Sequence, residues 1–455
     1  MQDLPCTESE RYPWLTEPAK RNLLRMLESV HAPTFNHQCG DRLDPKTREQ
    51  CAEFEKSLAG PLHRPSEPEP AWLNAFQTRC VEHVPIYRQL GRGATRFSEL
   101  PTVGRKDLYD QPWAFVPDNQ PLDDLMVYFT SGTTGRHLDI LSHPYVSTCY
   151  LILLKKVLAE FGIRLKSGPD QVVIALVCAQ KSTYTYASVS GYLDGAGFIK
   201  INLNSSDWPE PEAIGAYLRD MNPQIISGDP LALAHLRHVA PALRPDALVS
   251  SAMTLSEPFA QALTKTFECP VLNVYSMNEC RLLAYQSQQG FRLASPDVYM
   301  EIMDPDQDQV LQPGQWGELV VTCPRNPFLP LLRYRTGDFG RLQPSDSGWL
   351  IQDFEGRPPV AFRTQQGTWI NNIDISAKLR DLPWIQFTLH QKKSGDLVLE
   401  LLAEAHLIPK VTQRLKALFG AGQKIQVKTF DPNAQAKPIQ YSSVLDQQPV
   451  NLSFP

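Results

Sequence analysis

Short apolar runs alternate with amphipathic segments through the middle of the chain, and this alternation constrains the fold more than any other feature. Residues 172–179 (VVIALVCA) are apolar without alternation, which is typical of a strand buried on both faces. Further strands are expected at 197–204 and 223–230, with helices at 211–221 and 230–243 beside them. Strands and helices that alternate at intervals of roughly 20–30 residues predict an α/β sheet with crossover helices.

Different patterns flank this central region. Leucines recur at helical spacing in residues 15–30, and apolar residues do so in residues 71–84. Short β segments dominate from Val271 to Leu342. The C-terminal part contains a predicted strand pair, a helix at 410–420 and one more strand, which is enough for a small α+β domain.

The composition excludes several classes of protein. The chain has 455 residues, of which 42% are hydrophobic and 20% charged, and this balance is ordinary for a globular protein. A net charge of −5 gives no support to a nucleic-acid partner, which usually needs a basic face. No stretch approaches the ~20 apolar residues that span a bilayer. Because the start also lacks a signal-peptide pattern, we expect a cytoplasmic protein with no membrane span. The 9 cysteines form no C-x-x-C pair, which predicts reduced thiols.

The strongest chemical signal is the loop T-S-G-T-T-G at Thr130–Gly135, which follows a predicted strand. Glycines permit positive φ, so consecutive backbone amides can converge on an anion, and the hydroxyls add donors for phosphate oxygens. Arg136 follows immediately with a fixed positive charge. The loop lacks the Walker A spacing, and by itself it could also be a surface turn.

Two weaker signals follow in the chain. Asp338, in Y-R-T-G-D, is expected at a strand end, where a carboxylate can accept two hydrogen bonds from a ribose diol. Tyr275 offers a face for an adenine ring, and Glu279 could hold Mg²⁺ against phosphate oxygens. Alone, each pattern is more often a turn beside a strand, so their order and spacing carry the interpretation.

T-S-G-T-T-G, Y-x-x-x-E, G-E-L-V-V-T and R-Y-R-T-G-D, in this order, resemble the AMP-forming (adenylate-forming) acyl-CoA synthetase superfamily. Within it, H-V-P-I-Y at His83–Tyr87 and L-P-T-V-G-R-K-D-L at Leu100–Leu108 are similar to the phenylacetate–CoA ligase-like branch. The resemblance implies a large ATP- and acyl-binding domain at residues 70–352 and a small mobile α+β C-terminal lid at 353–455. Residues 1–69 would form a helical extension packed on the large domain.

The resemblance also implies a role for individual residues. Thr130, Glu279 and Lys437 would be catalytic, with Glu279 as the ligand of Mg²⁺. The nucleotide would be bound by the residues Ser131, Gly132, Thr133, Thr134, Gly135, Arg136, Ser251, Ala252, Tyr275, Asp338 and Arg357. An apolar acyl pocket would involve Tyr184, Tyr186 and Tyr192, which are equally compatible with a core role. For Lys437, a surface role is the weaker alternative.

The implied reaction is ATP-dependent formation of an acyl-AMP from a small carboxylic acid, aryl or otherwise apolar, followed by transfer to a thiol such as coenzyme A. Two departures from the family pattern matter. Ser276 stands where a glycine usually follows Tyr275, and residues 367–376 lack the usual proline and glutamate of a segment that shapes the thioester-forming state. An enzyme that loads a carrier protein or an amine therefore stays open as the alternative. A nucleotide-binding protein without catalysis is disfavoured by the intact motifs.

Overall fold

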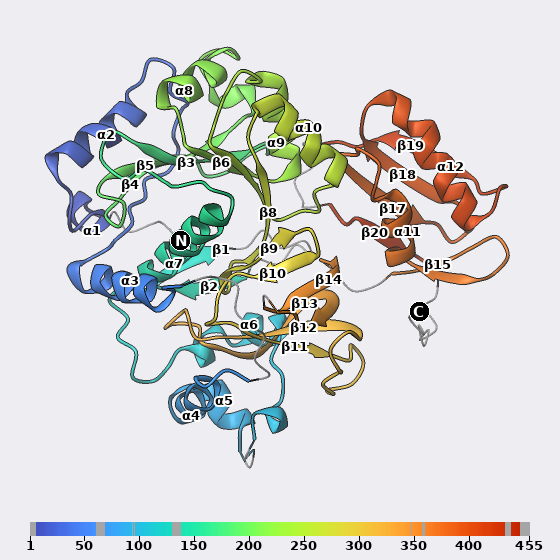
Figure 1. Ribbon diagram of the computed structural model, residues 1–455, viewed down its shortest axis with the longest axis horizontal. Helices are drawn as coiled ribbons and strands as arrows, with labels where there is room; N and C mark the ends of the chain where they lie inside the picture. Colours follow the sequence, from blue (N-terminus) through green and yellow to red (C-terminus); the bar gives the residue numbers. More distant parts are fainter. Residues whose placement is uncertain are drawn as a thin grey trace.

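The largest feature of the computed structural model, which describes residues 6–60, 69–92, 94, 96–129, 138–346, 348–356, 360–432 and 438–445, is one sheet of 12 strands (Figure 1). The strand order is β11-β12-β13-β14-β10-β9-β8-β7-β6-β3-β5-β4. These strands are β3 (Val172–Cys178), β4 (Tyr186–Ser190), β5 (Ala196–Asn202), β6 (Ile225–Gly228), β7 (Ala247–Ser250), β8 (Val271–Met277), β9 (Arg281–Ser287), β10 (Gly290–Leu293), β11 (Tyr299–Met303), β12 (Trp316–Cys323), β13 (Leu331–Gln343) and β14 (Leu350–Glu355). The predicted α/β fold class is therefore confirmed.

The half of this sheet from β5 to β8 is parallel and is covered by helices on both faces. Adjacent residues of one strand alternate between two cores: Leu248 packs in one and Val249 in the other. The first core is closed by α2 (Glu17–Leu27), α8 (Ala213–Met221), α9 (Pro230–Val239) and α10 (Glu257–Phe267), and the second by α3 (Pro45–Ser57) and α7 (Pro144–Glu160). Two buried faces explain why VVIALVCA has no polar alternation.

The antiparallel half begins where β9 pairs with β8 and runs to β11 at the edge. Its core is shared with the short helices α4 (Leu73–His83), α5 (Pro85–Leu90) and α6 (Arg105–Asp110). A separate hairpin is formed by β1 (Met126–Phe129) and β2 (Asp139–Ser142). The remaining helix of the N-terminal part is α1 (Glu8–Arg11).

The N-terminal segment is anchored on the parallel half of the sheet. On α2, Ala19 and Met26 are fully buried in the first core. Asn22 is 2% exposed, and its amide nitrogen donates to the carbonyl oxygens of Gln171 and Gly195, each at 3.0 Å. These contacts hold α2 against the starts of β3 and β5.

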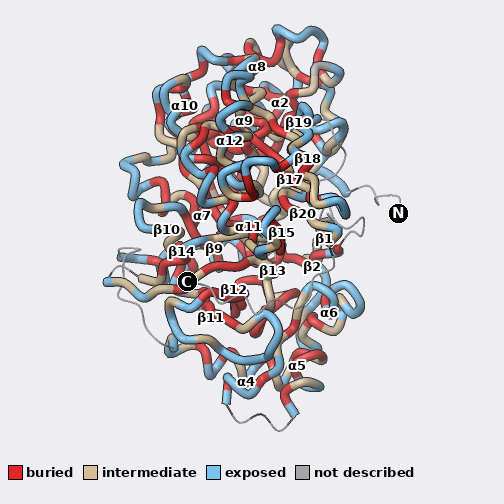
Figure 2. The backbone as a smooth tube through the Cα atoms, turned by 90° about the vertical axis from the view of Figure 1, so that its right-hand side faces the viewer, coloured by how far each residue is buried: buried red, intermediate tan, exposed pale blue. Residues whose placement is uncertain are grey.

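The C-terminal unit has its own sheet in the order β19-β18-β17-β20 and its own core, which includes Phe362 and Leu415. It consists of β15 (Ala361–Arg363), β16 (Trp369–Asn371), α11 (Asn372–Leu379), β17 (Gln386–Gln391), β18 (Leu397–Leu402), α12 (Ile408–Phe419), β19 (Ile425–Thr429) and β20 (Tyr441–Ser443). In Figure 1 it lies beyond α10, and Ser256 Oγ donates to the carbonyl oxygen of Trp384 at 2.8 Å. Figure 2 shows buried residues running through both sheets. The domain boundary at residue 353 stays a prediction.

No helix in the described part of the chain is long and apolar enough to cross a membrane. All of the cysteines lie within the described ranges, and each is a free thiol.

Candidate active site

Two of the sequence motifs meet through a direct hydrogen bond. Tyr275, on β8, donates its hydroxyl to Asp338 Oδ2 on β13 at 2.6 Å. The Tyr275 side chain is 6% exposed, and its ring lies 4.6 Å from the ring of Phe354 on β14. Residues 63 positions apart in the chain therefore share one polar contact at the end of β8.

The T-G-D of the second motif forms a bulge that projects Asp338 out of β13. Arg335 pairs with Val320 and Phe339 with Glu318, so three residues of β13 are accommodated opposite one residue of β12. Thr336 Oγ1 accepts from the amide of Asp338 at 3.0 Å and donates to the carbonyl oxygen of Leu319 at 2.7 Å. Gly337 has φ of 74°, a conformation that residues with a Cβ rarely adopt. The bulge explains why this strand carries a threonine, a glycine and an aspartate in succession.

Glu279 lies in the tight turn between β8 and β9. Its side chain is only 6% exposed, and Oε1 accepts a hydrogen bond from the hydroxyl of Tyr334 at 3.2 Å. Arg105, the first residue of α6, places Nη1 3.9 Å from the same oxygen. Burial raises the pKa of the Glu279 carboxyl, and the positive charges of Arg105 and Arg281 oppose this shift.

The predicted phosphate-binding residues Thr130, Ser131, Gly132, Thr133, Thr134, Gly135 and Arg136 lie outside the described residues. The two strands that flank them are described, and Phe129 pairs with Asp139. The guanidinium of Arg281 lies 4.5 Å from the ring centre of Tyr128 on β1. Because Arg281 is two residues beyond Glu279, the end of β1 at Tyr128 lies beside the Glu279 turn.

Ser251 and Ala252 follow β7 at the carboxyl edge of the parallel strands. The amide of Ser251 donates to the carbonyl oxygen of Gly228 at 3.3 Å, and Ala252 has φ of 69°. The pairing of β7 with β8 ends at Ser250, which lies opposite Asn273, two residues before Tyr275. Ser251 and Ala252 therefore leave β7 at the same edge of the sheet at which β8 continues to Tyr275.

Arg357 and Lys437 both lie outside the described residues, although their neighbours are described. Gly356 precedes Arg357, and a Cβ at Gly356 would lie 3.7 Å from Asp338 Oδ1. Lys437 comes shortly before β20, which pairs in parallel with β17 in the C-terminal unit. Gly356 therefore lies beside Asp338.

The three tyrosines proposed for an acyl pocket are not brought together. Tyr186 begins β4 opposite Lys200 near the carboxyl end of β5, and Tyr184 is close by, 62% exposed, with its ring 5.1 Å from that of His37. Tyr192 follows the other end of β4, so it lies at the opposite edge of the sheet. There Lys155 Nζ is 3.5 Å from the Tyr192 hydroxyl.

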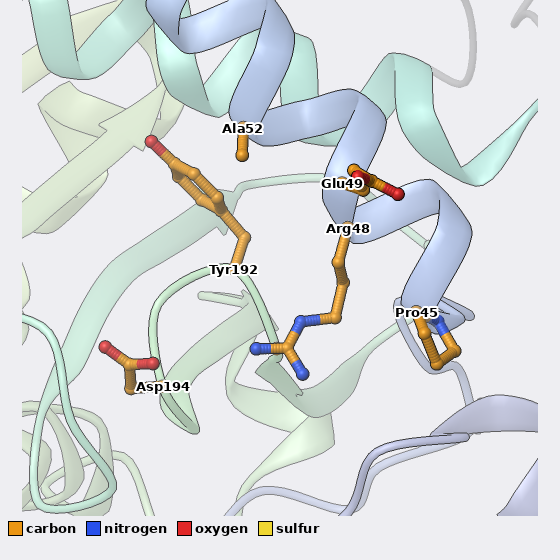
Figure 3. Close-up of a pocket in the computed structure, with 7 residues that line it drawn as sticks. Pro45, Arg48, Glu49, Ala52, Tyr192 and Asp194 are labelled. Carbon is orange, nitrogen blue, oxygen red and sulfur yellow. The ribbon is translucent and has the colours of Figure 1, made fainter.

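A depression with a volume of about 440 Å³ lies beside Tyr192 (Figure 3), and neither Tyr275 nor Asp338 lines it. It is lined by residues of α3 and of the turn between β4 and β5: Pro45, Arg48, Glu49, Ala52, Gly191, Tyr192 and Asp194. Tyr192 is therefore part of a different surface from the one that holds the nucleotide motifs.

Three residues at the site were not singled out from the sequence: Tyr334, Arg105 and Phe354. Tyr334 is part of R-Y-R-T-G-D, but its hydroxyl contact to Glu279 depends on how β13 passes the β8–β9 turn. Arg105 lies in the branch-specific L-P-T-V-G-R-K-D-L segment, which offered a signal that could have identified it. Phe354 carries no motif, and only the pairing of β14 beside β13 brings it to Tyr275.

Known proteins resemble this chain in sequence and in fold. No family model matches the chain. The chain is 25% identical over 304 residues to a phenylacetate-coenzyme A ligase of Pseudomonas putida, a match that covers 58% of this chain and 64% of that protein. It is 26% identical over 309 residues to a phenylacetate-coenzyme A ligase of Escherichia coli (strain K12), with coverage of 60% and 68%. The chain thus matches about two thirds of the length of these relatives.

Among solved structures, a 2-hydroxyisobutyryl-CoA ligase in the postadenylation state with 2-HIB-AMP matches with a TM-score of 0.59 at 18% identity, over 81% of this chain and 88% of that chain. An open conformation of the same ligase, with 2-HIB-AMP and CoA, gives a TM-score of 0.51 at 18% identity, over 83% of this chain and 91% of that chain. The resemblance predicted from the motifs is confirmed: the chain has the fold of adenylate-forming ligases, and its sequence is similar to their phenylacetate–coenzyme A ligase branch.

Proposed function

We propose that this chain is an ATP-dependent ligase that activates a carboxylic acid as an acyl-AMP and passes the acyl group to a thiol such as coenzyme A. The observation that carries the proposal is the hydrogen bond between Tyr275 and Asp338. Tyr275 lies four residues before the buried Glu279, so the three motif residues form one region. β1, the strand that precedes the T-S-G-T-T-G segment, lies beside the turn that carries Glu279. Ligases that resemble this chain in sequence and in fold support the same reaction class.

In the proposed reaction a carboxylate oxygen attacks the α-phosphorus of ATP, and pyrophosphate leaves. A thiol then attacks the acyl carbon, and AMP leaves. Asp338 would accept hydrogen bonds from the ribose hydroxyls, and Tyr275 would lie against the adenine with Ser251 and Ala252. Thr130–Gly135 and Arg136 would bind the phosphates, and Arg357 the ribose or a phosphate. Lys437 would hold the carboxylate against the α-phosphorus.

Glu279 has the chemistry that a magnesium ligand requires. Mg²⁺ binds through one or two carboxylates together with substrate phosphates. Glu279 is a buried carboxylate, and it lies beside β1, the strand that precedes the proposed phosphate-binding loop. Tyr334 orients Oε1 through its hydroxyl, so the position of the carboxylate is fixed. A bound Mg²⁺ would neutralise charge that develops on the phosphates.

An aryl or otherwise apolar acid is the proposed substrate class. The half-buried Tyr186 lies at the carboxyl edge of the sheet, on the same edge as Ser251, and exposed Tyr184 precedes it. Residues at this edge would line the acyl pocket, and Tyr192, at the other end of β4, is not part of the proposed lining.

A carrier protein or an amine as the acceptor is the second candidate. In the segment 367–376, Asn371 and Asp374 form a capping box at the start of α11, with Asn371 Oδ1 accepting from the amide of Asp374 at 3.1 Å. These two side chains cap the N-terminus of α11, and they lie in the segment that departs from the family pattern. Adenylation is therefore better supported than transfer to coenzyme A.

Carboxylate-dependent ATP–pyrophosphate exchange tests the proposal. The purified chain is screened with aryl, fatty and amino acids, and exchange above the acid-free background is expected for at least one apolar acid. Product formation with coenzyme A, against an acyl carrier protein or an amine, then decides the acceptor. ATP binding without exchange for any acid would overturn the ligase assignment.

A further inference from the structure

We propose that Arg105 is a further nucleotide-binding residue, which contacts the β- and γ-phosphates of ATP and the pyrophosphate formed from them. This inference rests on the proposed function, because it assumes that the Tyr275–Asp338 and Glu279 region binds ATP. It goes further by assigning the phosphate end of the site to a residue of the N-terminal helices.

The backbone before Arg105 is added to the main sheet as a short strand. The amide of Val103 donates to the carbonyl oxygen of Arg333 at 3.1 Å, and the amide of Arg335 donates to the carbonyl oxygen of Val103 at 2.7 Å. Val103 thus forms a parallel bridge with Tyr334. This pairing fixes where α6 begins, two residues later, and brings Arg105 to the residue that hydrogen-bonds Glu279.

The pairing is reinforced by side chains from both sides. Arg333 is 1% exposed, and its guanidinium contacts the carbonyl oxygens of Ser98 and Leu100 while it forms a buried ion pair with Glu301 at 3.1 Å. Arg335 Nε donates to Thr102 Oγ1 at 2.9 Å. Since buried charges are held by several partners at once, the segment before α6 is rigidly attached to β13. Arg105 therefore starts from a fixed backbone position.

The side chain of Arg105 bridges solvent and the buried carboxylate. It is 48% exposed, whereas Glu279, with Oε1 at 3.9 Å from Arg105 Nη1, is 6% exposed. The 3.9 Å separation is longer than a hydrogen bond, so Arg105 and Glu279 interact as an ion pair at the edge of solvent. Arg281 approaches the Glu279 turn separately, with its guanidinium over Tyr128.

The spacing of Asp338 and Tyr334 along β13 indicates that the anion bound by Arg105 is the phosphate end of the nucleotide. Tyr334 and Asp338 are four residues apart on β13, so at ~3.3 Å per residue they are separated by at most ~13 Å. If Asp338 holds the ribose, a polyphosphate chain that extends toward Glu279 reaches the Tyr334 end, where Arg105 lies. A planar guanidinium suits phosphate oxygens, which it can bind through two parallel hydrogen bonds.

Charge balance favours the same assignment. A divalent cation on Glu279 would repel the guanidinium that now faces this carboxylate. A polyphosphate accommodates both cations, because it carries several negative oxygens. Arg105 and the cation would then lie on the same phosphates, and Arg105 would leave Glu279 when Mg²⁺ and ATP bind.

Equilibrium binding by calorimetry tests the assignment with Arg105→Gln and Arg105→Lys, measured against ATP, AMP and inorganic pyrophosphate in the presence of Mg²⁺. Loss of a charge-assisted hydrogen bond predicts about 10- to 100-fold weaker binding of ATP and pyrophosphate by Arg105→Gln. AMP affinity should stay at the wild-type value, because AMP lacks the β- and γ-phosphates. Arg105→Lys should recover part of the loss, and it replaces Arg105→Gln if that variant does not fold.

Lys106→Gln is the matched control, since Lys106 is the next residue, is 86% exposed and pairs with Asp110 on the surface of α6. It should bind all three ligands like the wild type. Wild-type affinity of Arg105→Gln for ATP and pyrophosphate would overturn the inference, and so would an equal loss of AMP and ATP. Failure of the proposed function is distinguishable, because then the wild type itself shows no carboxylate-dependent exchange.

Discussion

Asp338 illustrates how one carboxylate can be both structural and functional. It accepts the hydroxyl hydrogen of Tyr275 through Oδ2, while a ribose diol would need acceptor capacity on the same group. We expect Asp338→Ala to weaken ATP and AMP binding to a similar degree, by about tenfold or more, because both nucleotides carry the ribose. Nucleotide titration measures this, and Tyr275→Phe separates the loss of the internal hydrogen bond from the loss of the carboxylate. Unaltered affinity in Asp338→Ala would remove this residue from the ribose site.

Lys437 is expected to act on the reaction and not on nucleotide binding. Lys437→Ala should lose most carboxylate-dependent pyrophosphate exchange, by about 100-fold or more, while ATP affinity is retained, because the ammonium is proposed to stabilise charge in the transition state. Lys428→Ala is the control, since Lys428 is an exposed residue of β19. Equal exchange rates in the wild type and Lys437→Ala would show that another residue supplies this charge.

At the residue scale, the role of a side chain could be predicted from the sequence only where the residues adjacent to it in the chain determine its position. Glu279 and Asp338 lie in compact motifs whose local backbone, a turn and a bulge, is itself encoded by adjacent residues. The contact of Arg105 with Glu279 could not be predicted in this way, because it depends on pairing of Val103 with Tyr334, more than 200 residues away. Tyr192 is the converse case: it is close to Tyr186 in sequence, but the length of β4 separates the two.

At the scale of elements, the bulge in β13 predicts a specific effect of glycine replacement. Gly337 has φ of 74°, and a Cβ there would have nothing within 4 Å, so the cost of Gly337→Ala is backbone strain alone, about 1–2 kcal/mol. Because the strain falls on the residue before Asp338, ATP affinity should also drop. Gly395→Ala is the matched control: Gly395 has φ of 85° and equally open surroundings, in the turn between β17 and β18.

Chemical denaturation and ATP titration of the two alanine variants distinguish the outcomes. Both variants should lose a similar free energy of unfolding, but only Gly337→Ala should bind ATP more weakly. If Gly395→Ala reduced ATP affinity as much, the effect would reflect general destabilisation and not the geometry of the bulge.

The predictability of the elements follows from how their faces are buried. Strands such as β3 have two buried faces and were readable as apolar runs, and α8 and α9 were readable from their apolar spacing. β10 and β14 were not predicted, because they are short and carry many half-buried or exposed positions, which gives no clear period. Their place beside β9 and β13 is decided by tertiary pairing.

At the scale of the whole molecule, the C-terminal unit contacts the main sheet through a partly buried carboxyl group. Glu355 ends β14, and its Oε2 accepts from Asn372 Nδ2 on α11 at 3.4 Å. Burial raises the pKa of Glu355 to about 7, although Ser376, Asn372 and Arg380 favour the charged form, and Asp353 adds to the increase. Tyr441 faces the same carboxyl and hydrogen-bonds Ser376 at 2.8 Å.

This carboxyl makes the attachment of the C-terminal unit depend on pH. A raised pKa means that the folded chain holds a proton between about pH 4.5 and 7 that the unfolded chain has released, so stability decreases as pH rises through this interval. Glu355→Gln stays neutral at every pH. Its free energy of unfolding, relative to that of the wild type, should therefore increase by roughly 1–3 kcal/mol from pH 5 to pH 8. Thermal unfolding and hydrogen exchange of the α11 amides across that range measure this gain. Glu404→Gln, at an exposed carboxylate of the same unit, should show no such trend. A difference between wild type and Glu355→Gln that does not change with pH would mean that Glu355 is already ionised in the folded chain, and that the two parts are held by their other contacts, such as Ser256 with Trp384.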